Sequence, residues 1–311
     1  MYQKTPRLYN YKKVYLKPVE TLFATAYSVD IEEFRRRAFY PGKPLLLSKE
    51  TNINGTTPYY TSLPVAQKWF TNSVSTSGKC SFILSREYLS PHAATILPFE
   101  IMGPPHKSLI DLFRAGQETK SFTECMEKFH LFKAPLALIL NSRIEGLYIA
   151  QAPLTDLPPQ LQQDFSTPRV VVEAGKGDIY NANIWIGNPP TYTPLHKDPN
   201  PNLFVQLTGM KKIRLFEPNV GLEIFKKARR NIGRQEHSGV IRGREMMEGS
   251  ERKELEKLVW SSEENFPWDG MEVTVKSGDS LFIPSGWWHS IKGLRDADKD
   301  EVVASVNWWF R

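Results

Sequence analysis

The second half of the chain, residues 136–311, consists of short apolar or alternating runs separated by glycine, proline and asparagine. The runs are "LALILNS", "GLYIAQA", "RVVVEA", "NANIWIGN", "NLFVQLTG", "KKIRLFEP", "MEVTVKSG", "DSLFIPSG" and "VVASVNWWF". Many short strands with turn signals between them are typical of a β-sandwich or a β-barrel. We therefore expect a mainly β core over residues 136–311.

The first 135 residues predict a mixed region in which helices flank a few strands and pack on that core. From Val29 to Ser48 the pattern indicates a helix, a Pro-Gly stop and a buried strand. Asp30 is the expected N-cap, with Glu33 at the capping-box position. Further short helices are predicted at Pro64–Asn72, Pro105–Ala115 and Ser121–Phe132.

The segment Leu222–Leu258 interrupts the strand pattern with a charged, helix-like stretch rich in lysine and arginine. We interpret it as an insertion over one end of the β core. A charged insertion of this kind is commonly a solvated face, but long insertions at the rim of a barrel also carry specificity. Contact with a substrate or partner therefore stays open.

Composition places the chain among ordinary globular proteins, with 41% hydrophobic and 24% charged residues among 311. No stretch approaches the roughly 20 apolar residues of a membrane helix, so no membrane partner is expected. Two cysteines do not make a disulfide framework and no secretory signal is visible, which favours an intracellular location in cytoplasm or nucleus. The net charge of +6 permits RNA as a partner without requiring it.

A histidine and an aspartate lie two residues apart in "PLHKDP", just before the run "NLFVQLTG". Residues i and i+2 of a strand point to the same side, so His196 and Asp198 would share one face. Two histidines and one carboxylate on one face form the metal site of non-haem Fe(II) oxygenases. The second histidine is predicted to be His289, which follows a strand and a Pro-Ser-Gly bend in "GDSLFIPSGWWHSI".

Lys211 lies inside an apolar, strand-like run, where a buried ammonium group is costly unless an anion meets it. Such oxygenases use 2-oxoglutarate, whose far carboxylate needs a cation and hydroxyl donors. Lys211 is the candidate cation, and Thr193 and Tyr148 are candidate hydroxyl donors. Strand alternation places one lysine of the Lys211–Lys212 pair in solvent, and we expect that one to be Lys212.

These residues resemble those of the JmjC-domain-only 2-oxoglutarate oxygenases, the group that includes the arginyl and lysyl hydroxylases and factor inhibiting HIF. The resemblance runs from about "FYPGKPLLL" to the C-terminus. It is carried by "YIAQAPLTDLPPQLQQDF", "NIWIGNPPTYTPLHKDPNPNLFVQLTGMKKIRLFEP", "GDSLFIPSGWWHSI" and "SVNWWF". The resemblance implies a double-stranded β-helix, the jelly-roll or cupin fold, with the charged insertion at about 222–258.

The resemblance also implies roles for nine residues. Iron ligands would be His196, Asp198 and His289, and the tail of 2-oxoglutarate would be bound by Tyr148, Thr193 and Lys211. Asn202 and Asn307 would lie near the iron-bound end of the cosubstrate, and Trp185 would line the substrate side of the pocket. The cofactors would be Fe(II), 2-oxoglutarate and O2.

Three classes of function remain open from the sequence. The favoured one is hydroxylation of an amino-acid side chain in a protein or peptide. The second is another 2-oxoglutarate oxygenase, such as an N-methyl-lysine demethylase, a tRNA-base hydroxylase or a small-molecule hydroxylase. The third is a non-catalytic cupin scaffold, against which the complete set of ligands and Lys211 argue.

Overall fold

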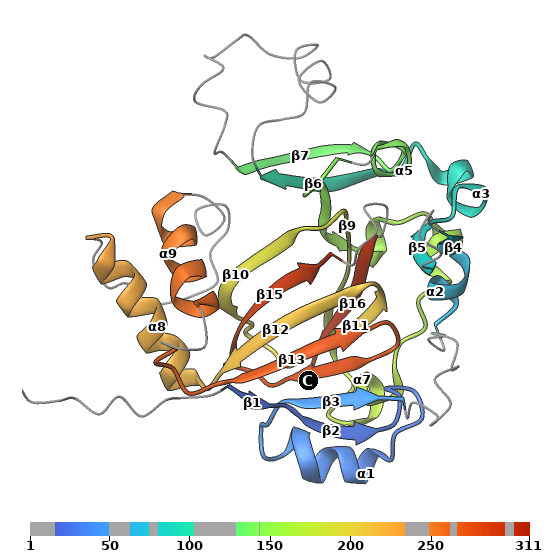
Figure 1. The fold of residues 1–311 in the computed structure, drawn as a ribbon. Coiled ribbons are helices and arrows are strands. Elements are labelled where there is room, and N and C mark those ends of the chain that lie inside the picture. The colour runs from blue at the N-terminus through green and yellow to red at the C-terminus, as the bar shows by residue number, and fades with distance from the viewer. Residues whose placement is uncertain are drawn as a thin grey trace, which may run out of the picture.

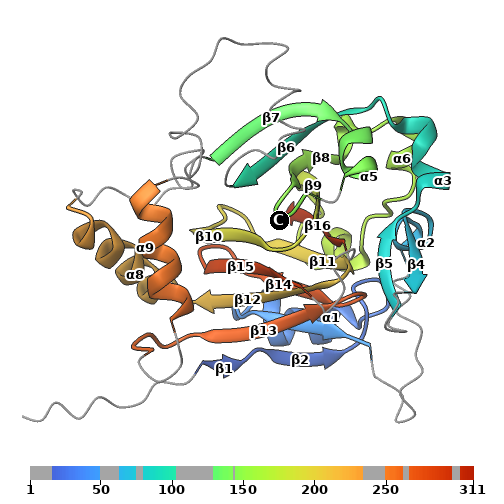
Figure 2. The ribbon, with the colours of Figure 1, turned by 45° about the horizontal axis from the view of Figure 1, so that its top comes forward.

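The computed structural model describes residues 16–49, 63–74, 80–102, 129–142, 144–233, 249–261, 266–295 and 302–311. Two large β-sheets face each other, with helices around them (Figures 1 and 2). The nine-stranded sheet has the order β2-β3-β14-β11-β16-β9-β8-β6-β7, and the five-stranded sheet has the order β1-β13-β12-β15-β10. The expected mainly β fold with flanking helices is confirmed.

Eight strands at the centre alternate between the two sheets in a regular way. They are β9 (Ile179–Gly187), β10 (Thr191–Lys197), β11 (Asn202–Thr208), β12 (Met210–Phe216), β13 (Met271–Lys276), β14 (Ser280–Ile283), β15 (Trp288–Leu294) and β16 (Val303–Phe310). The chain moves to the other sheet after each strand except β12, which β13 follows in the same sheet. This antiparallel winding is the double-stranded β-helix, and it sets β10 and β15 side by side although they are far apart in sequence.

The remaining strands extend these sheets or form a separate hairpin. They are β1 (Lys17–Pro18), β2 (Glu20–Phe23), β3 (Leu45–Ser48), β4 (Phe70–Val74), β5 (Cys80–Leu84), β6 (Ile96–Met102), β7 (Phe129–Pro135) and β8 (Tyr148–Pro153). Strands from residues 1–135 thus join the same nine-stranded sheet as β8 and β9. The division of the chain at residue 135 stays a prediction.

The helices are mostly short and lie around the two sheets (Figures 1 and 2). They are α1 (Ile31–Phe34), continued by the π-helical turn η1 (Arg35–Phe39), and α2 (Pro64–Lys68), α3 (Arg86–Leu89), α5 (Ala137–Asn141), α6 (Pro159–Gln162), α7 (Arg169–Glu173), α8 (Pro218–Asn231) and α9 (Gly249–Trp260), with 3-10 turns η2 (Ser90–His92) and η4 (Leu154–Asp156). Asp30 caps α1 as predicted, because its side chain accepts a hydrogen bond from the Glu33 amide. None of the described helices has the length and apolar character needed to cross a membrane.

The insertion forms a helical pair on the outer face of the five-stranded sheet (Figure 1). The apolar sides of α8 and α9 pack against the sheet. Phe225 of α8 stacks on Trp288 of β15, with ring centroids 5.5 Å apart. Buried Arg229 of α8 forms an ion pair with buried Glu251 of α9 at 3.2 Å. The helix-like character of the insertion is therefore confirmed for its described ends, while residues 234–248 lie outside the described residues.

Several local predictions were wrong. Two runs predicted as strands, "LALILNS" and "RVVVEA", form α5 and α7, because a short apolar run fits a buried helix as well as a strand. The helix expected over Pro64–Asn72 ends at Lys68, and β4 begins at Phe70. The end of the helix expected over Ser121–Phe132 is strand β7 from Phe129. Residues 121–128 and the helix expected at Pro105–Ala115 lie outside the described residues.

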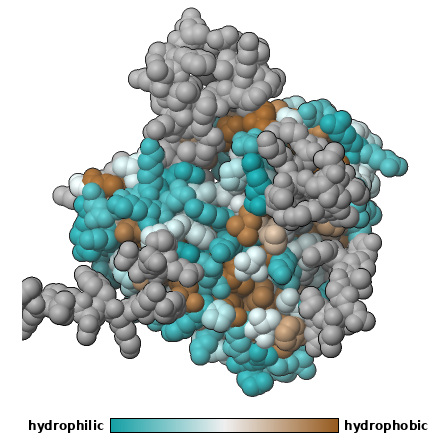
Figure 3. Space-filling model, viewed as in Figure 1, coloured by the Kyte–Doolittle hydropathy of each residue, from teal (hydrophilic) through white to brown (hydrophobic). Residues whose placement is uncertain are grey.

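The surface seen from the direction of Figure 1 is mainly hydrophilic over the described residues, with small groups of hydrophobic side chains (Figure 3). The apolar core lies instead inside the fold. One buried cluster fills the space between the two sheets with side chains from both, including Phe204, Ile213 and Leu281. A larger cluster packs the N-terminal region against the outer face of the nine-stranded sheet.

Candidate metal centre and adjoining pocket

Strand pairing brings the two predicted histidine ligands together. In the antiparallel β10–β15 pair, His196 lies directly opposite His289. Their ring centroids are 4.2 Å apart, and Asp198 follows immediately after the end of β10. An irregularity in the pairing between Thr193 and His196 alters the register just before the first ligand. Bulges of this kind are common beside functional sites because they redirect a side chain.

The ligand atoms of His196, Asp198 and His289 all lie within 4.8 Å of one another. His289 Nε2 is 3.7 Å from Asp198 Oδ2. Metal–ligand distances of roughly 2 Å mean that a single ion fits among donors with such spacing after small side-chain rotations. Two imidazoles and one carboxylate gathered on one side of a barrel are suited to a divalent transition metal with open coordination positions.

Backbone carbonyls orient both imidazole rings. His196 Nδ1 donates to the Pro194 carbonyl at 2.9 Å, and His289 Nδ1 lies 3.3 Å from the Trp287 carbonyl. A ring whose Nδ1–H is engaged in this way presents an unprotonated Nε2 to its other side, as a metal ligand requires. Sequence reasoning missed these carbonyl acceptors. In both cases the carbonyl belongs to the residue two positions before the histidine, and this shared spacing was the available signal.

Electrostatics favour the protonation states that bind metal. Burial, and after it the proximity of His196, lower the pKa of His289, so its imidazole is neutral at neutral pH. Its contact with Asp198 is then not an ion pair. Burial alone would raise the pKa of Asp198, but His289, His196 and a hydrogen bond from Asn202 outweigh it and hold that pKa below its usual value. The cluster thus combines the carboxylate of Asp198 with the neutral imidazole of His289.

Asn202 and Asn307 form a hydrogen-bonded chain that ends on the carboxylate. Asn202 Nδ2 donates to Asp198 Oδ2 at 2.9 Å, and Asn307 Nδ2 donates to Asn202 Oδ1 at 3.0 Å. The two side chains face each other because their strands, β11 and β16, are neighbours in the nine-stranded sheet. Both asparagines therefore lie beside the three candidate ligands, and they fix the orientation of Asp198. Their expected place near the iron-bound end of 2-oxoglutarate stays a prediction.

Lys211 is buried, with 2% of its surface exposed, in the pocket that contains the three candidate ligands. Its Nζ donates to Tyr148 Oη at 3.1 Å and to Ser305 Oγ at 2.8 Å. No carboxylate of the described chain pairs with it, and burial lowers its pKa to about 7. Lys212 points to the other side of β12 and pairs with Glu272 at 3.0 Å, as strand alternation predicts.

Thr193 and Trp185 line the same pocket. Trp185 of β9 lies against the Tyr148 ring, with centroids 5.8 Å apart, and its buried Nε1 has no hydrogen-bond partner within the described chain. Ser305 was missed by the sequence analysis. Its position two residues before Asn307 in one strand was the available signal, because both side chains then face the same side.

Gly187 allows the Tyr148 ring to lie where it does. A Cβ atom at this position would come within 2.1 Å of Tyr148 Cδ2. We therefore expect Gly187→Ala to displace the ring and to lower the free energy of unfolding by about 1–3 kcal/mol, as overpacking does. Denaturant unfolding monitored by circular dichroism measures this change. A stability within about 0.5 kcal/mol of the wild type would mean that the ring has room to move.

A family model described as a cupin-like domain matches residues 95–311. Among curated relatives, "Lysine-specific demethylase JMJ30" of Arabidopsis thaliana is 27% identical over 198 residues, covering 62% of this chain and 39% of the relative. "Lysine-specific demethylase 8" of Danio rerio is 29% identical, covering 52% of this chain and 36% of the relative. "Bifunctional peptidase and (3S)-lysyl hydroxylase JMJD7" of Homo sapiens is 21% identical, covering 57% and 59%. The chain spans less than two thirds of the length of these three relatives.

Proposed function

The chain belongs to the cupin-like domain family, and we propose that it is an Fe(II)- and 2-oxoglutarate-dependent oxygenase that hydroxylates a side chain of a protein substrate. One observation carries the proposal. The His196, Asp198 and His289 cluster shares a pocket with Lys211, a buried amine for which the described chain offers no carboxylate. A metal site alone fits many cupins, but a buried cation beside it calls for an anionic cosubstrate.

The donor set fits Fe(II). His196, Asp198 and His289 would hold the ion from one side and leave the remaining positions for 2-oxoglutarate and O2. When bound, iron with 2-oxoglutarate supplies the activation of O2 and the oxidising power for attack on a C–H bond. The carbonyl contacts of the two histidines and the Asn202–Asp198 hydrogen bond keep the donors aimed at one point.

The opposite end of the pocket would bind the far carboxylate of 2-oxoglutarate. Lys211 would provide the charge, and the hydroxyl groups of Tyr148, Thr193 and Ser305 would provide further hydrogen bonds. An arriving carboxylate favours the ammonium form of Lys211, so binding would take up a proton near neutral pH. The rings of Phe204 and Tyr148 lie 5.3 and 5.6 Å from Lys211 Nζ and would limit the access of water to this ion pair.

N-methyl-lysine demethylation is the second candidate, because two of the relatives reported above carry that activity in their names. Both reactions begin with oxygenation of a C–H bond, so the same metal centre serves either. The third relative is named as a lysyl hydroxylase. For an RNA substrate the support is limited to the net charge of +6, and an intracellular location stays a prediction.

An anaerobic titration tests the proposal directly. Adding Fe(II) and then 2-oxoglutarate to the purified chain is expected to produce a saturable visible absorption band from metal-to-cosubstrate charge transfer. Succinate in place of 2-oxoglutarate is the control and should give no such band. Absence of the band at saturating ligand would overturn the assignment of the site and bring the scaffold interpretation forward.

A further inference from the structure

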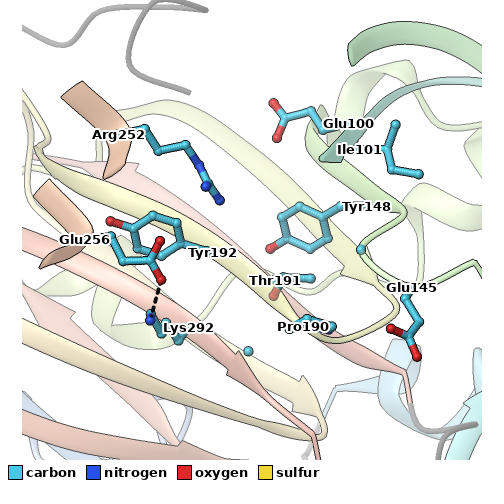
Figure 4. Close-up of a pocket in the computed structure, with 12 residues that line it drawn as sticks. Glu100, Ile101, Glu145, Tyr148, Pro190, Thr191, Tyr192, Arg252, Glu256 and Lys292 are labelled. Atoms are coloured by element: carbon cyan, nitrogen blue, oxygen red, sulfur yellow. Dashed lines mark hydrogen bonds and ion pairs between the residues drawn. The ribbon is translucent and has the colours of Figure 1, made fainter. Parts of the chain in front are cut away.

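Helix α9 is fixed to both of the strands that carry the candidate histidine ligands. Figure 4 shows Glu256 of α9 joined by an ion pair to Lys292 of β15, at 2.7 Å, with Tyr192 of β10 beside them. One turn earlier in α9, the Arg252 guanidinium lies over the Tyr192 ring at 4.7 Å. The helix therefore contacts β10 and β15 on the face that points away from the pocket.

Trp260, the last residue of α9, is held over the sheet by two cations. The Arg214 guanidinium lies 4.7 Å and the Lys292 ammonium 5.0 Å from the centre of its ring. Arg214 is buried and also donates to the Val259 carbonyl at 2.7 Å. Aromatic faces attract cations, so β12 and β15 together set the position of this indole.

Two hydrogen bonds lead from Trp260 to Thr193. Trp260 Nε1 donates to Ser290 Oγ at 2.9 Å, and Ser290 Oγ donates to the Thr193 carbonyl at 2.8 Å. An indole N–H can only donate, whereas a hydroxyl has one proton and can also accept. Trp260 therefore occupies the acceptor side of the Ser290 hydroxyl and directs its single proton to Thr193. Ser290 is 0% exposed, so solvent does not compete for this proton.

The carbonyl that receives this proton lies at the bulge in β10. Between Thr193 and His196, β10 has two residues where β15 has only Ser290. An extra residue of this kind disrupts the ladder of backbone hydrogen bonds locally. The next carbonyl, that of Pro194, accepts from His196 Nδ1 at 2.9 Å. Side chains thus hold two consecutive carbonyls of the bulge, one from the pocket side and one from the α9 side.

We propose that Trp260 and Ser290 are positioning residues for the cosubstrate, and that they make the binding of 2-oxoglutarate depend on helix α9. The Thr193 side chain lines the pocket that contains Lys211 and the candidate metal ligands. A shift of the backbone at the bulge would move the Thr193 hydroxyl away from the far carboxylate of 2-oxoglutarate. The inference rests on the proposed oxygenase function.

The anaerobic charge-transfer titration measures this effect as the Kd for 2-oxoglutarate. Trp260→Phe keeps an aromatic ring and removes the N–H, so the Kd should increase about three- to tenfold, as expected for one net hydrogen bond. Trp268→Phe is the matched control and should leave the Kd unchanged. Trp268 packs against the same apolar cluster, and its Nε1 has no hydrogen-bond partner within the described chain.

A double-mutant cycle separates the relay from simple packing. Ser290→Ala alone should increase the Kd at least as much as Trp260→Phe does. Because Trp260 acts through Ser290, the double variant should have the same Kd as Ser290→Ala. Additive effects would show that Trp260 contributes by packing and would overturn the inference, as would a wild-type Kd in Trp260→Phe.

Hydrogen exchange measured by mass spectrometry tests the same relay without iron or 2-oxoglutarate. Peptides from β10 should exchange about three- to tenfold faster in Trp260→Phe and in Ser290→Ala than in the wild type. Peptides from β11 should keep the wild-type rate, and Trp268→Phe should match the wild type in both strands. Unchanged exchange in β10, or equal acceleration in both strands from a loss of global stability, would count against the relay.

The two readouts distinguish failure of this inference from failure of the proposed function. A wild type without a charge-transfer band would overturn the oxygenase assignment, while the exchange of β10 would still decide whether Trp260 and Ser290 hold the bulge. A band whose Kd is the same in the wild type and both variants would overturn the inference and leave the oxygenase assignment in place.

Discussion

Asp198→Ala is expected to reduce succinate production from 2-oxoglutarate to the rate of a protein-free control and to abolish the charge-transfer band. The variant removes the carboxylate of the three-donor cluster and leaves two imidazoles to hold the ion. Fe(II) favours sites with oxygen and nitrogen donors, and the loss of the anionic donor also removes the charge that offsets the cation. Succinate measured by mass spectrometry under saturating Fe(II) and 2-oxoglutarate checks the result.

Two controls separate a lost ligand from a lost fold. Asp178→Ala removes an exposed carboxylate that pairs with Arg311 at 2.8 Å, and it should leave succinate production unchanged. Asp198→Asn keeps the shape of the side chain that Asn202 contacts, so its Tm should stay near that of the wild type while turnover is still lost. Full succinate production by either Asp198 variant would show that this cluster is not the catalytic metal site.

Much of the candidate site could be predicted because several of its residues are close together in the sequence. His196 and Asp198 lie two residues apart at the end of a strand, and Lys211 and Lys212 alternate along one. The period of a β-strand alone assigns such residues to faces. The choice of His289 as the second histidine needed more than the period, and the strand and Pro-Ser-Gly bend before it provided that signal.

Other features depend on register between distant segments, which a single sequence does not carry. Ser305 reaches Lys211 because β16 and β12 lie in opposite sheets that face each other. Glu100 lies opposite Tyr148 because β6 pairs with β8 in one register, and a shift of one residue would turn its side chain to the other face. Neither relation is marked in local hydrophobicity, and for Ser305 the sequence offers only its position two residues before Asn307.

The failed secondary-structure predictions have a related cause. "RVVVEA" is rich in β-branched residues and predicts a strand, yet α7 forms there and buries Val170 and Val171. The sequence provides a proline just before this helix and an Arg169–Glu173 pair at helical spacing, with Nε and Oε1 2.8 Å apart. Burial in the core and these two local signals together outweigh a weak intrinsic preference for a strand.

Lys211→Met is expected to separate cosubstrate binding from stability. The variant removes the cation proposed for the far carboxylate of 2-oxoglutarate. Loss of a buried charge partner costs roughly 2–5 kcal/mol of binding free energy, so the Kd should increase by at least about 30-fold. Methionine keeps the length and apolar stem of the side chain, so the pocket stays filled. The charge-transfer titration measures the Kd, and Lys212→Ala, which changes the neighbouring lysine outside the pocket, should leave it unchanged.

Lys211→Met should weaken cosubstrate binding but raise the stability of the folded protein. The reason is that burial lowers the pKa of Lys211 from 10.5 to about 7. The unfolded chain then holds a proton that the folded chain releases, so this amine opposes folding increasingly as pH falls from about 10.5 to 7. Replacing it should raise the Tm near pH 7, and the difference from the wild type should shrink towards pH 10. A lower Tm in Lys211→Met would instead indicate that the hydrogen bonds to Tyr148 and Ser305 hold the barrel together.

The same pKa predicts how 2-oxoglutarate binding by the wild type varies with pH. Binding needs the ammonium form of Lys211, which is depleted in the free protein as pH rises above about 7. In the wild type the Kd for 2-oxoglutarate should therefore increase by up to about tenfold per pH unit above about pH 7. In Lys211→Met the Kd should not change with pH in this way. A buried lysine kept only for packing would give no such slope. The combination of a pH-dependent Kd, a weakened variant and an undiminished Tm would identify Lys211 as a residue retained for an anion at the expense of stability.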